Sequence, residues 1–101
     1  MAERNSNNRR NGTGSRLTAR EAIRRVREEF PELFGRPIES VLGVERDEDN
    51  GWKVTVQVLE LSRIPSTTDV LGSYAVTLDR NGDLVGYRRN RRYHRNQVEE
   101  D

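Results

Sequence analysis

Hydrophobic residues recur with a helical period between residues 19 and 30 of the chain. A stripe at this spacing predicts an amphipathic helix whose apolar face packs on the rest of the protein. Thr18 and Glu21 have the spacing of a capping box, in which each side chain accepts a hydrogen bond from the other residue's backbone N–H. We therefore expect the helix to begin after Thr18. Its apolar residues are Ala19, Ala22, Ile23, Val26 and Phe30.

Pro31 marks the expected end of this helix. The ring of a proline disfavours helical backbone at the preceding residue, here Phe30, so the helix should end or kink at that point. The sequence leaves room for one more short turn up to Phe34, closed by Gly35.

Four segments after the helix have strand character. The clearest covers residues 52–58, where apolar and polar residues alternate, the period-two pattern of a strand with one buried face. Residues 38–46, 70–79 and 83–93 are the other expected strands; the first is the least regular, with Leu42 and Val44 facing inward. The residues expected to face the helix from the two central strands are Trp52, Val54, Val56, Val58, Tyr74, Val76 and Leu78.

Short polar segments separate these strands, so neighbouring strands should be antiparallel. Residues 47–51 form a polar turn, residues 63–69 form a loop around Pro65, and Asn81-Gly82 predicts a tight type I′ hairpin turn. One helix can cover one face of such a sheet. The predicted fold is therefore α+β, with an N-terminal amphipathic helix packed on a four-stranded antiparallel meander, in the order α-β-β-β-β.

Most apolar residues lie in residues 17–95, which form the expected single folded domain. Residues 1–16 are polar and cannot bury enough apolar surface to offset their loss of conformational entropy, so we expect a disordered tail. Residues 96–101 form an acidic C-terminal tail. The chain has no cysteine, no apolar run of the roughly 18 residues that cross a bilayer, and no apolar segment of a signal peptide. We expect a cytoplasmic protein without disulfides that does not bind membranes.

The formal net charge of +1 hides blocks of opposite sign. Residues 80–95 contain six arginines and one aspartate, whereas residues 96–101 contain three acidic residues and no basic one. Blocks of one sign are typical of interaction surfaces or solvated tails. Among 18 basic residues only Lys53 is a lysine, which indicates GC-rich coding more than a chemical requirement.

Residues that would support catalysis or metal binding are sparse. His94 is the one histidine, so a clustered metal site is not expected. Residues 66–68 offer hydroxyl groups beside Asp69, but no general base is near in sequence, and turn hydrogen bonds are their expected role. The acidic residues at 45–49 lack the pattern of a calcium loop, and no glycine-rich phosphate-binding motif occurs. We predict no enzyme activity, no cofactor and no metal.

The segment from Tyr87 to Arg95 interleaves five arginines with two tyrosines. Three interpretations are open. Arginine pairs with phosphates and stacks on bases, which suits nucleic acid; tyrosine and arginine are also favoured anchors of protein interfaces; and charges on an edge strand prevent pairing with other sheets.

The strands carry a resemblance to a known family. Residues 51–95, together with the helix and Gly43-Val44, resemble the gas vesicle protein GvpO family. The individual residues are unspecific, but their joint occurrence in this order is fairly specific. The matching pattern is Gly51-Trp52 with alternating valines, Glu60, Arg63-Ile64-Pro65, Asp69, Tyr74, Leu78-Asp79, Gly82, Tyr87-x-Arg89 and Arg91-Arg92-Tyr93.

The resemblance implies an accessory factor of gas vesicle formation. Gas vesicles are protein-walled, gas-filled compartments that give buoyancy, and the implied location is the cytoplasm, in association with them. The family occurs in actinobacteria and haloarchaea, and the arginine usage and near-neutral charge fit an actinobacterial protein better. The implied partners are the shell protein and other accessory proteins, with no catalytic residue to transfer.

Two rival functions remain at this point. One is a nucleic-acid-binding regulator of gas vesicle genes that uses the arginine-rich strand; the other is a self-associating component of the vesicle wall, which the 35% charged residues disfavour. Protein contacts are the preferred interpretation. The candidate partner-binding residues are Arg63, Tyr87, Arg88, Arg89, Arg91, Arg92, Tyr93 and Arg95.

Overall fold

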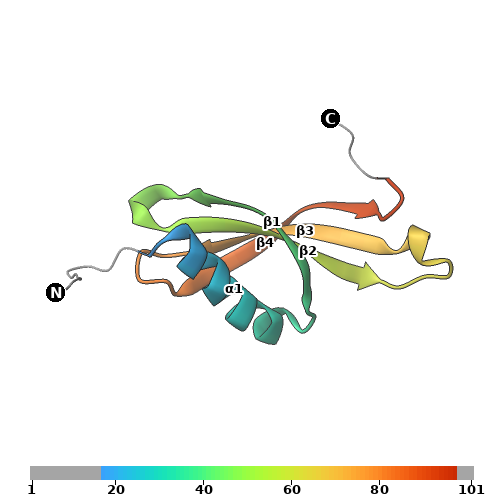
Figure 1. The fold of residues 1–101 in the computed structure, drawn as a ribbon, viewed down its shortest axis with the longest axis horizontal. Helices are drawn as coiled ribbons and strands as arrows, with labels where there is room; N and C mark the ends of the chain where they lie inside the picture. Colours follow the sequence, from blue (N-terminus) through green and yellow to red (C-terminus); the bar gives the residue numbers. More distant parts are fainter. Residues whose placement is uncertain (1–16, 98–101) are drawn as a thin grey trace.

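The chain folds into one α-helix followed by a four-stranded antiparallel sheet (Figure 1). The computed structural model describes residues 17–97, so the predicted tail at residues 1–16 and most of the acidic tail lie outside the described residues. The strands lie side by side in chain order, and each pair of neighbours is antiparallel. The predicted α+β meander is confirmed. Its elements are α1 (Ala19–Phe34), β1 (Ile38–Arg46), β2 (Trp52–Leu61), β3 (Val70–Leu78) and β4 (Leu84–His94), with short 3-10 turns at Glu48–Asn50 and Ser66–Thr68.

The predicted capping box at the start of α1 is confirmed. The Thr18 hydroxyl accepts a hydrogen bond from the Glu21 backbone N–H at 3.1 Å, and the Thr18 N–H donates to the Glu21 carboxylate at 2.9 Å. Two backbone donors of the first turn, which have no partner within the helix, are satisfied in this way.

α1 does not end at Phe30 but continues through Pro31 to Phe34, so the further short turn closed by Gly35 is confirmed. Aromatic packing stabilises this last turn: the Phe34 ring lies 5.0 Å from the Phe30 ring and 4.8 Å from the Tyr74 ring, centroid to centroid. Gly35 then ends the helix with φ 89°, and its N–H donates to the Pro31 carbonyl. The left-handed conformation favours glycine at this position.

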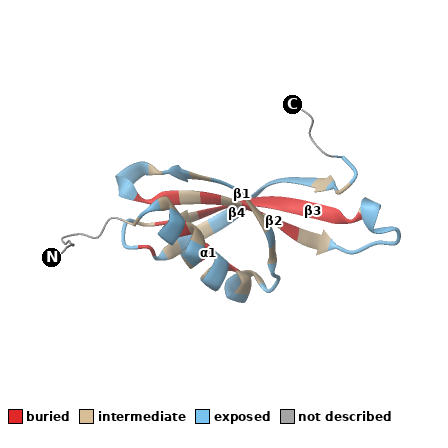
Figure 2. Ribbon diagram, in the orientation of Figure 1, coloured by how far each residue is buried: buried red, intermediate tan, exposed pale blue. Residues whose placement is uncertain are grey.

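α1 packs on one face of the sheet, which we call the helix face; the other is the open face. The predicted core is confirmed, with buried residues along β2, β3 and the inner side of α1 (Figure 2). The Trp52 indole N–H donates to the Leu17 carbonyl at 3.0 Å and fixes the start of the helix on the sheet. The residues with no exposed surface are Ala22, Val26, Phe30, Val54, Val56, Val58 and Val76.

One inward position predicted in β1 is wrong. Leu42 is 51% exposed, whereas Val41 and Val44 pack against the core. The pairing register of β1 with β2 shifts between Val41 and Gly43. A bulge of this kind adds one residue and moves it out of the alternating pattern, so Leu42 points away from the core.

The turn between β3 and β4 also differs from the predicted type I′ turn. Gly82 has φ 89°, but Asn81 has no positive φ, and type I′ needs positive φ at both residues. A longer loop forms instead, in which the Asp79 N–H donates to the Asp83 carbonyl and the Gly82 N–H donates to the Asp79 carbonyl, both at 2.9 Å. The Asp79 carboxylate accepts the N–H groups of Asn81 and Asp83, which stabilises this loop.

α1 covers only part of the helix face. In Figure 1 the β2–β3 hairpin and the last residues of β4 extend beyond the C-terminal end of the helix. We call this part of the molecule, residues 59–72 and 90–97, the far end.

Candidate functional site

The side chains of β4, which carries most of the predicted partner-binding residues, are divided between the two faces of the sheet. Arg89 lies opposite Tyr74 on the helix face, and Arg88 lies opposite Ala75 on the open face. The basic segment is therefore not one continuous patch. Tyr87, Arg89 and Arg92 lie on the helix face, and Arg88, Arg91 and Tyr93 lie on the open face.

A bulge in β4 decides which arginines lie together. Arg89 and Arg91 pair with consecutive residues of β3, so Asn90 between them is an extra residue. In a regular strand, residues two positions apart share a face. The bulge instead brings Arg89 and Arg92 to the same face, and both contact one carboxylate.

That carboxylate belongs to Glu60 at the end of β2. Its oxygens accept hydrogen bonds from Arg92 Nε at 3.0 Å, from Arg89 Nε at 3.3 Å and from the Tyr74 hydroxyl at 2.6 Å. The Glu60 side chain is only 9% exposed. Gly72 provides the space for it, because a Cβ at Gly72 would lie 2.1 Å from Glu60 Oε2.

Glu60 stays ionised in this position. Burial opposes its ionisation, but the hydrogen bonds from Tyr74 and Arg92 and the charge of Arg89 outweigh burial, so the pKa of Glu60 lies below its ordinary value. Burial and the hydrogen bond to Glu60 raise the pKa of Tyr74. Two arginines around one buried carboxylate leave a net positive charge on this part of the surface.

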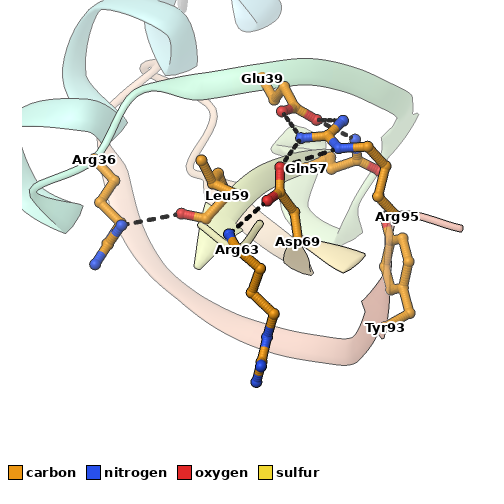
Figure 3. A network of polar contacts seen from close by, with 8 residues as sticks. All are labelled: Arg36, Glu39, Gln57, Leu59, Arg63, Asp69, Tyr93 and Arg95. Carbon is orange, nitrogen blue, oxygen red and sulfur yellow. Dashed lines mark hydrogen bonds and ion pairs between the residues drawn. The ribbon is translucent and has the colours of Figure 1, made fainter. Parts of the chain in front are cut away.

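A second cluster centres on Asp69, which precedes β3 and is 5% exposed (Figure 3). Asp69 Oδ1 accepts the Arg63 backbone N–H at 2.8 Å. Asp69 Oδ2 accepts hydrogen bonds from two nitrogens of the Arg95 guanidinium, at 3.1 and 3.2 Å. The backbone N–H of Arg95 donates to the backbone carbonyl of Asp69. Asp69 thus joins the loop after β2 to the residues that follow β4.

Arg95 also reaches β1 across the open face. Its two terminal nitrogens contact the two carboxylate oxygens of Glu39 at 2.7 and 3.2 Å, a two-point contact that fixes orientation as well as distance. Gln57 donates to Glu39 at 2.7 Å and accepts a hydrogen bond from the Tyr93 hydroxyl. Side chains from both edges of the sheet therefore meet over β2 and β3 at the far end (Figure 3).

The charges in this second cluster reinforce one another. The Arg63 backbone N–H, followed by Arg95, holds the pKa of Asp69 below its ordinary value. The hydrogen bond from Arg95 lowers the pKa of Glu39, and these two carboxylates together raise the pKa of the Arg95 guanidinium. Glu39 has no local signal in the sequence, because its partner Arg95 lies 56 residues away.

The loop that Asp69 anchors presents an apolar side chain to solvent. Ile64 is 99% exposed, and Leu61, the last residue of β2, is 49% exposed. Hydrogen bonds within the loop support its shape: the Thr68 hydroxyl and N–H both donate to the Pro65 carbonyl, at 2.8 and 3.0 Å. A hollow of about 560 Å³ lies between this loop and the end of β4, lined by Leu61, Arg63, Val70, Arg92, His94 and Gln97 among others.

The predicted binding residues thus differ in what they contact. Arg89, Arg92 and Arg95 form ion pairs within the protein, and the Tyr87 ring packs edge-on against Phe30 with centroids 5.1 Å apart. The Arg91 guanidinium lies 5.1 Å from the centre of the Tyr93 ring. Within residues 17–97, the guanidinium groups of Arg63 and Arg88 have no carboxylate at ion-pair distance.

The other residues considered for catalysis have structural contacts. The Thr68 hydroxyl is bound to a turn carbonyl, and the His94 ring contacts the Gln97 side chain at 3.2 Å. In the described part of the chain, no three His, Cys, Asp or Glu residues are grouped to hold a metal ion. Across residues 17–97, no helix is long and apolar enough to cross a membrane.

A family model described as gas vesicle synthesis protein GvpO matches residues 4–99 of the chain, a range that includes both clusters and the exposed loop. The chain belongs to the GvpO family. The resemblance indicated by the valine strand, the Arg-Ile-Pro loop and the Tyr/Arg segment is therefore confirmed.

Relatives from bacteria and archaea agree with this GvpO assignment. Gas vesicle protein O of Streptomyces sp. (strain CB03234) is 54% identical over 67 residues, which cover 66% of this chain and 52% of that protein. Gas vesicle protein O1 of Halobacterium salinarum is 35% identical, over 84% of this chain and 71% of that protein. Gas vesicle protein O of Haloferax mediterranei is 34% identical, over 76% of this chain and 55% of that protein. The match thus spans about half the length of the Streptomyces protein. No solved structure matches the chain.

Proposed function

We propose that the protein is a non-catalytic accessory factor of gas vesicle formation, which binds the shell protein or other accessory proteins in the cytoplasm and at the vesicle. The family description and the names of the relatives support a role in vesicle formation. One structural observation supports binding as the mechanism: the loop at the far end presents a fully exposed isoleucine on a backbone that is anchored by hydrogen bonds.

Ile64 is the residue we place at the centre of the contact. Burial of an isoleucine side chain contributes about 1.5–3 kcal/mol relative to leaving it in water, and at 99% exposure the whole side chain is available to a partner. The hydrogen bond that Asp69 accepts from the Arg63 N–H and the one that Thr68 donates to Pro65 fix the loop before binding. A pre-ordered loop loses little conformational entropy on binding, which favours affinity.

The charge around Ile64 defines the partner further. Arg63 precedes it and has no carboxylate partner among the described residues, and the side chain of Arg92 remains 58% exposed beyond its contact with Glu60. Arg63 and Arg92 line the same hollow as the half-exposed Leu61, and basic groups beside apolar side chains fit a partner with an apolar surface that acidic side chains surround. Such charges mainly raise the association rate and are screened by salt.

Nucleic acid is a less favoured partner for the same arginines. Three of the five arginines in the basic segment are paired with Glu60, Asp69 or Glu39, and the segment is divided between two faces. Each internal pair reduces the positive charge available to a phosphate backbone.

The test is genetic complementation in a vesicle-forming strain that lacks the native gene. Two matched variants, Ile64→Ser and Leu33→Ser, each remove an exposed aliphatic side chain, but Leu33 lies on α1 and not on the loop; it is 63% exposed. We expect Ile64→Ser to reduce vesicle formation and the recovery of vesicle proteins with the tagged chain, and Leu33→Ser to retain both. Normal vesicles with Ile64→Ser would refute the proposed contact, and partners lost on nuclease treatment would favour nucleic acid instead.

A further inference from the structure

The open face has no helix, and the half of it nearest the β1–β2 and β3–β4 turns carries mainly small side chains. A Cβ added to Gly43 or Gly86 would meet no atom within 4 Å, and a hollow of about 620 Å³ lies over this surface. Val85 at its β4 edge is 61% exposed. We call this surface the near half of the open face; it includes Lys53, Thr55, Ala75, Thr77, Gly86 and Arg88.

Side chains of the protein itself cross the far half of the same face, beside a smaller hollow of about 440 Å³ that Leu42, Gln57 and Tyr93 help to line. The Tyr93 hydroxyl bonds to Gln57, and Arg95 reaches Glu39 across the sheet. As a result Leu71 beneath them is only 2% exposed. The larger of the two hollows on the open face lies over the near half, where no such contacts cross the sheet.

The two edges of the near half carry opposite charges. Glu45 and Asp47 lie on the β1 side, where Glu45 is 68% exposed and its contact with Lys53 is long, at 3.9 Å. Arg88 lies on the β4 side and has no carboxylate partner within residues 17–97. A surface that is acidic along one edge and basic along the other is complementary to itself.

We propose that the near half of the open face binds a second copy of this chain, to give a two-fold symmetric dimer of two stacked sheets. A two-fold axis parallel to the strands would place β1 of one copy over β4 of the other. Glu45 of each copy would then approach Arg88 of the other, twice in the dimer. A two-fold axis across the strands would instead place β1 over β1 and oppose like charges.

The strand register fits this arrangement. Glu45 lies in the row of Lys53, Thr77 and Gly86, and Arg88 lies in the next row of the same face. The offset is two residues along the strand, about 7 Å, which the long side chain of arginine can span. Val85, exposed at the β4 edge, would also be covered by the second copy.

The expected dimer is weak. Half of one face of a four-stranded sheet is smaller than the roughly 800 Å² that each partner contributes to a standard interface. The middle of the near half is also polar, with Thr55 and Thr77 in place of large apolar residues. We therefore expect a dimer that dissociates on dilution and on addition of salt, since exposed charge pairs are screened.

Sedimentation velocity of the purified chain tests this inference without any reference to vesicles. Over concentrations from about 5 to about 500 μM, a range that covers weak association, the wild type should pass from monomer to dimer. Arg88→Glu and Glu45→Arg should each weaken the dimer about tenfold or more, because each opposes like charges at two symmetric contacts. The double variant exchanges the two charges and should restore the dimer.

Control variants separate this surface from a general effect of charge. Arg24→Glu and Glu28→Arg reverse charges on the exposed side of α1 and should leave association unchanged, and circular dichroism should show that all variants fold. A wild type that stays monomeric throughout the range would overturn the inference. A dimer that resists both single reversals, or a double variant that stays monomeric, would overturn it as well.

Discussion

The Arg95 guanidinium donates hydrogen bonds to both carboxylate oxygens of Glu39, at 2.7 and 3.2 Å. Arg95 lies just beyond the last strand, and Glu39 lies at the start of the first. β1 and β4 are the two edges of the sheet, so this pair joins edges that no backbone ladder connects. The same guanidinium contacts Asp69, which anchors the exposed loop through the Arg63 N–H. The shape of the proposed binding loop therefore depends on residues at both edges.

Arg95→Gln should destabilise the fold, because it leaves the nearly buried Asp69 without its charged partner. Arg88→Gln is the matched control, since Arg88 has no carboxylate partner among the described residues. Thermal unfolding at low protein concentration should give a lower Tm for Arg95→Gln and an unchanged Tm for Arg88→Gln. Faster hydrogen exchange at the Arg63 amide in Arg95→Gln would show that the loop has lost its anchor. Equal Tm values for the two variants would mean that the Arg95 contacts do not stabilise the loop.

Val56→Ala should lower the free energy of unfolding by about 1–3 kcal/mol, since it removes methyl groups from a fully buried site. Thr55 is next to it in β2, on the open face, and Thr55→Ala should lower the free energy of unfolding by less than about 0.5 kcal/mol. Urea unfolding of both variants measures the difference. Equal losses would contradict the assignment of the two faces.

Gly72→Ala should destabilise the protein by about 1–3 kcal/mol, because the new Cβ would displace the Glu60 carboxylate from Tyr74, Arg89 and Arg92. Gly43→Ala is the control, as a Cβ there meets no atom within 4 Å. Denaturant unfolding should show a loss for Gly72→Ala only. A similar change in both variants would point to a general effect of replacing glycine in a strand.

Stability should fall in acid through three carboxylates. The pKa values of Glu39, Glu60 and Asp69 lie below their ordinary values. A group whose pKa is lower in the folded state stabilises the fold above its unfolded pKa, about 4, and this contribution is lost as pH falls through the folded pKa. Tm should thus decrease as pH falls from about 5 to about 3, and less steeply in Glu60→Gln, which has a lower Tm at pH 7. A parallel decrease in the variant and the wild type would exclude Glu60 as a source of this pH dependence.

The sequence predicts the fold well where the signals are local. The alternation from Trp52 to Val58 identifies the buried face of β2, and the Thr18–Glu21 pair identifies the start of α1, because both depend on neighbouring residues. Pro31 leaves the end of the helix open between Phe30 and Phe34, and tertiary packing of Phe34 stabilises the last turn that the local backbone preference opposes.

The site is less accessible from sequence, because bulges and distant partners determine it. The bulge at Asn90 decides that Arg89 and Arg92 share a face, and a bulge shifts every later position in the pattern. Glu60 meets arginines that are 29 and 32 residues away. The predicted basic segment is therefore present, but its division between two faces follows only from the structure.

The most direct test of the proposed function is photo-crosslinking from position 64 in vesicle-forming cells. A photoreactive amino acid would replace Ile64 in one strain and Leu33 in another; both sites are exposed, at 99% and 63%, so neither replacement should disturb the core. We expect light to join position 64, and not position 33, to a gas vesicle shell or accessory protein, at a segment with apolar and acidic residues. The absence of any such adduct from position 64 during vesicle formation, or the same adducts from both positions, would contradict it.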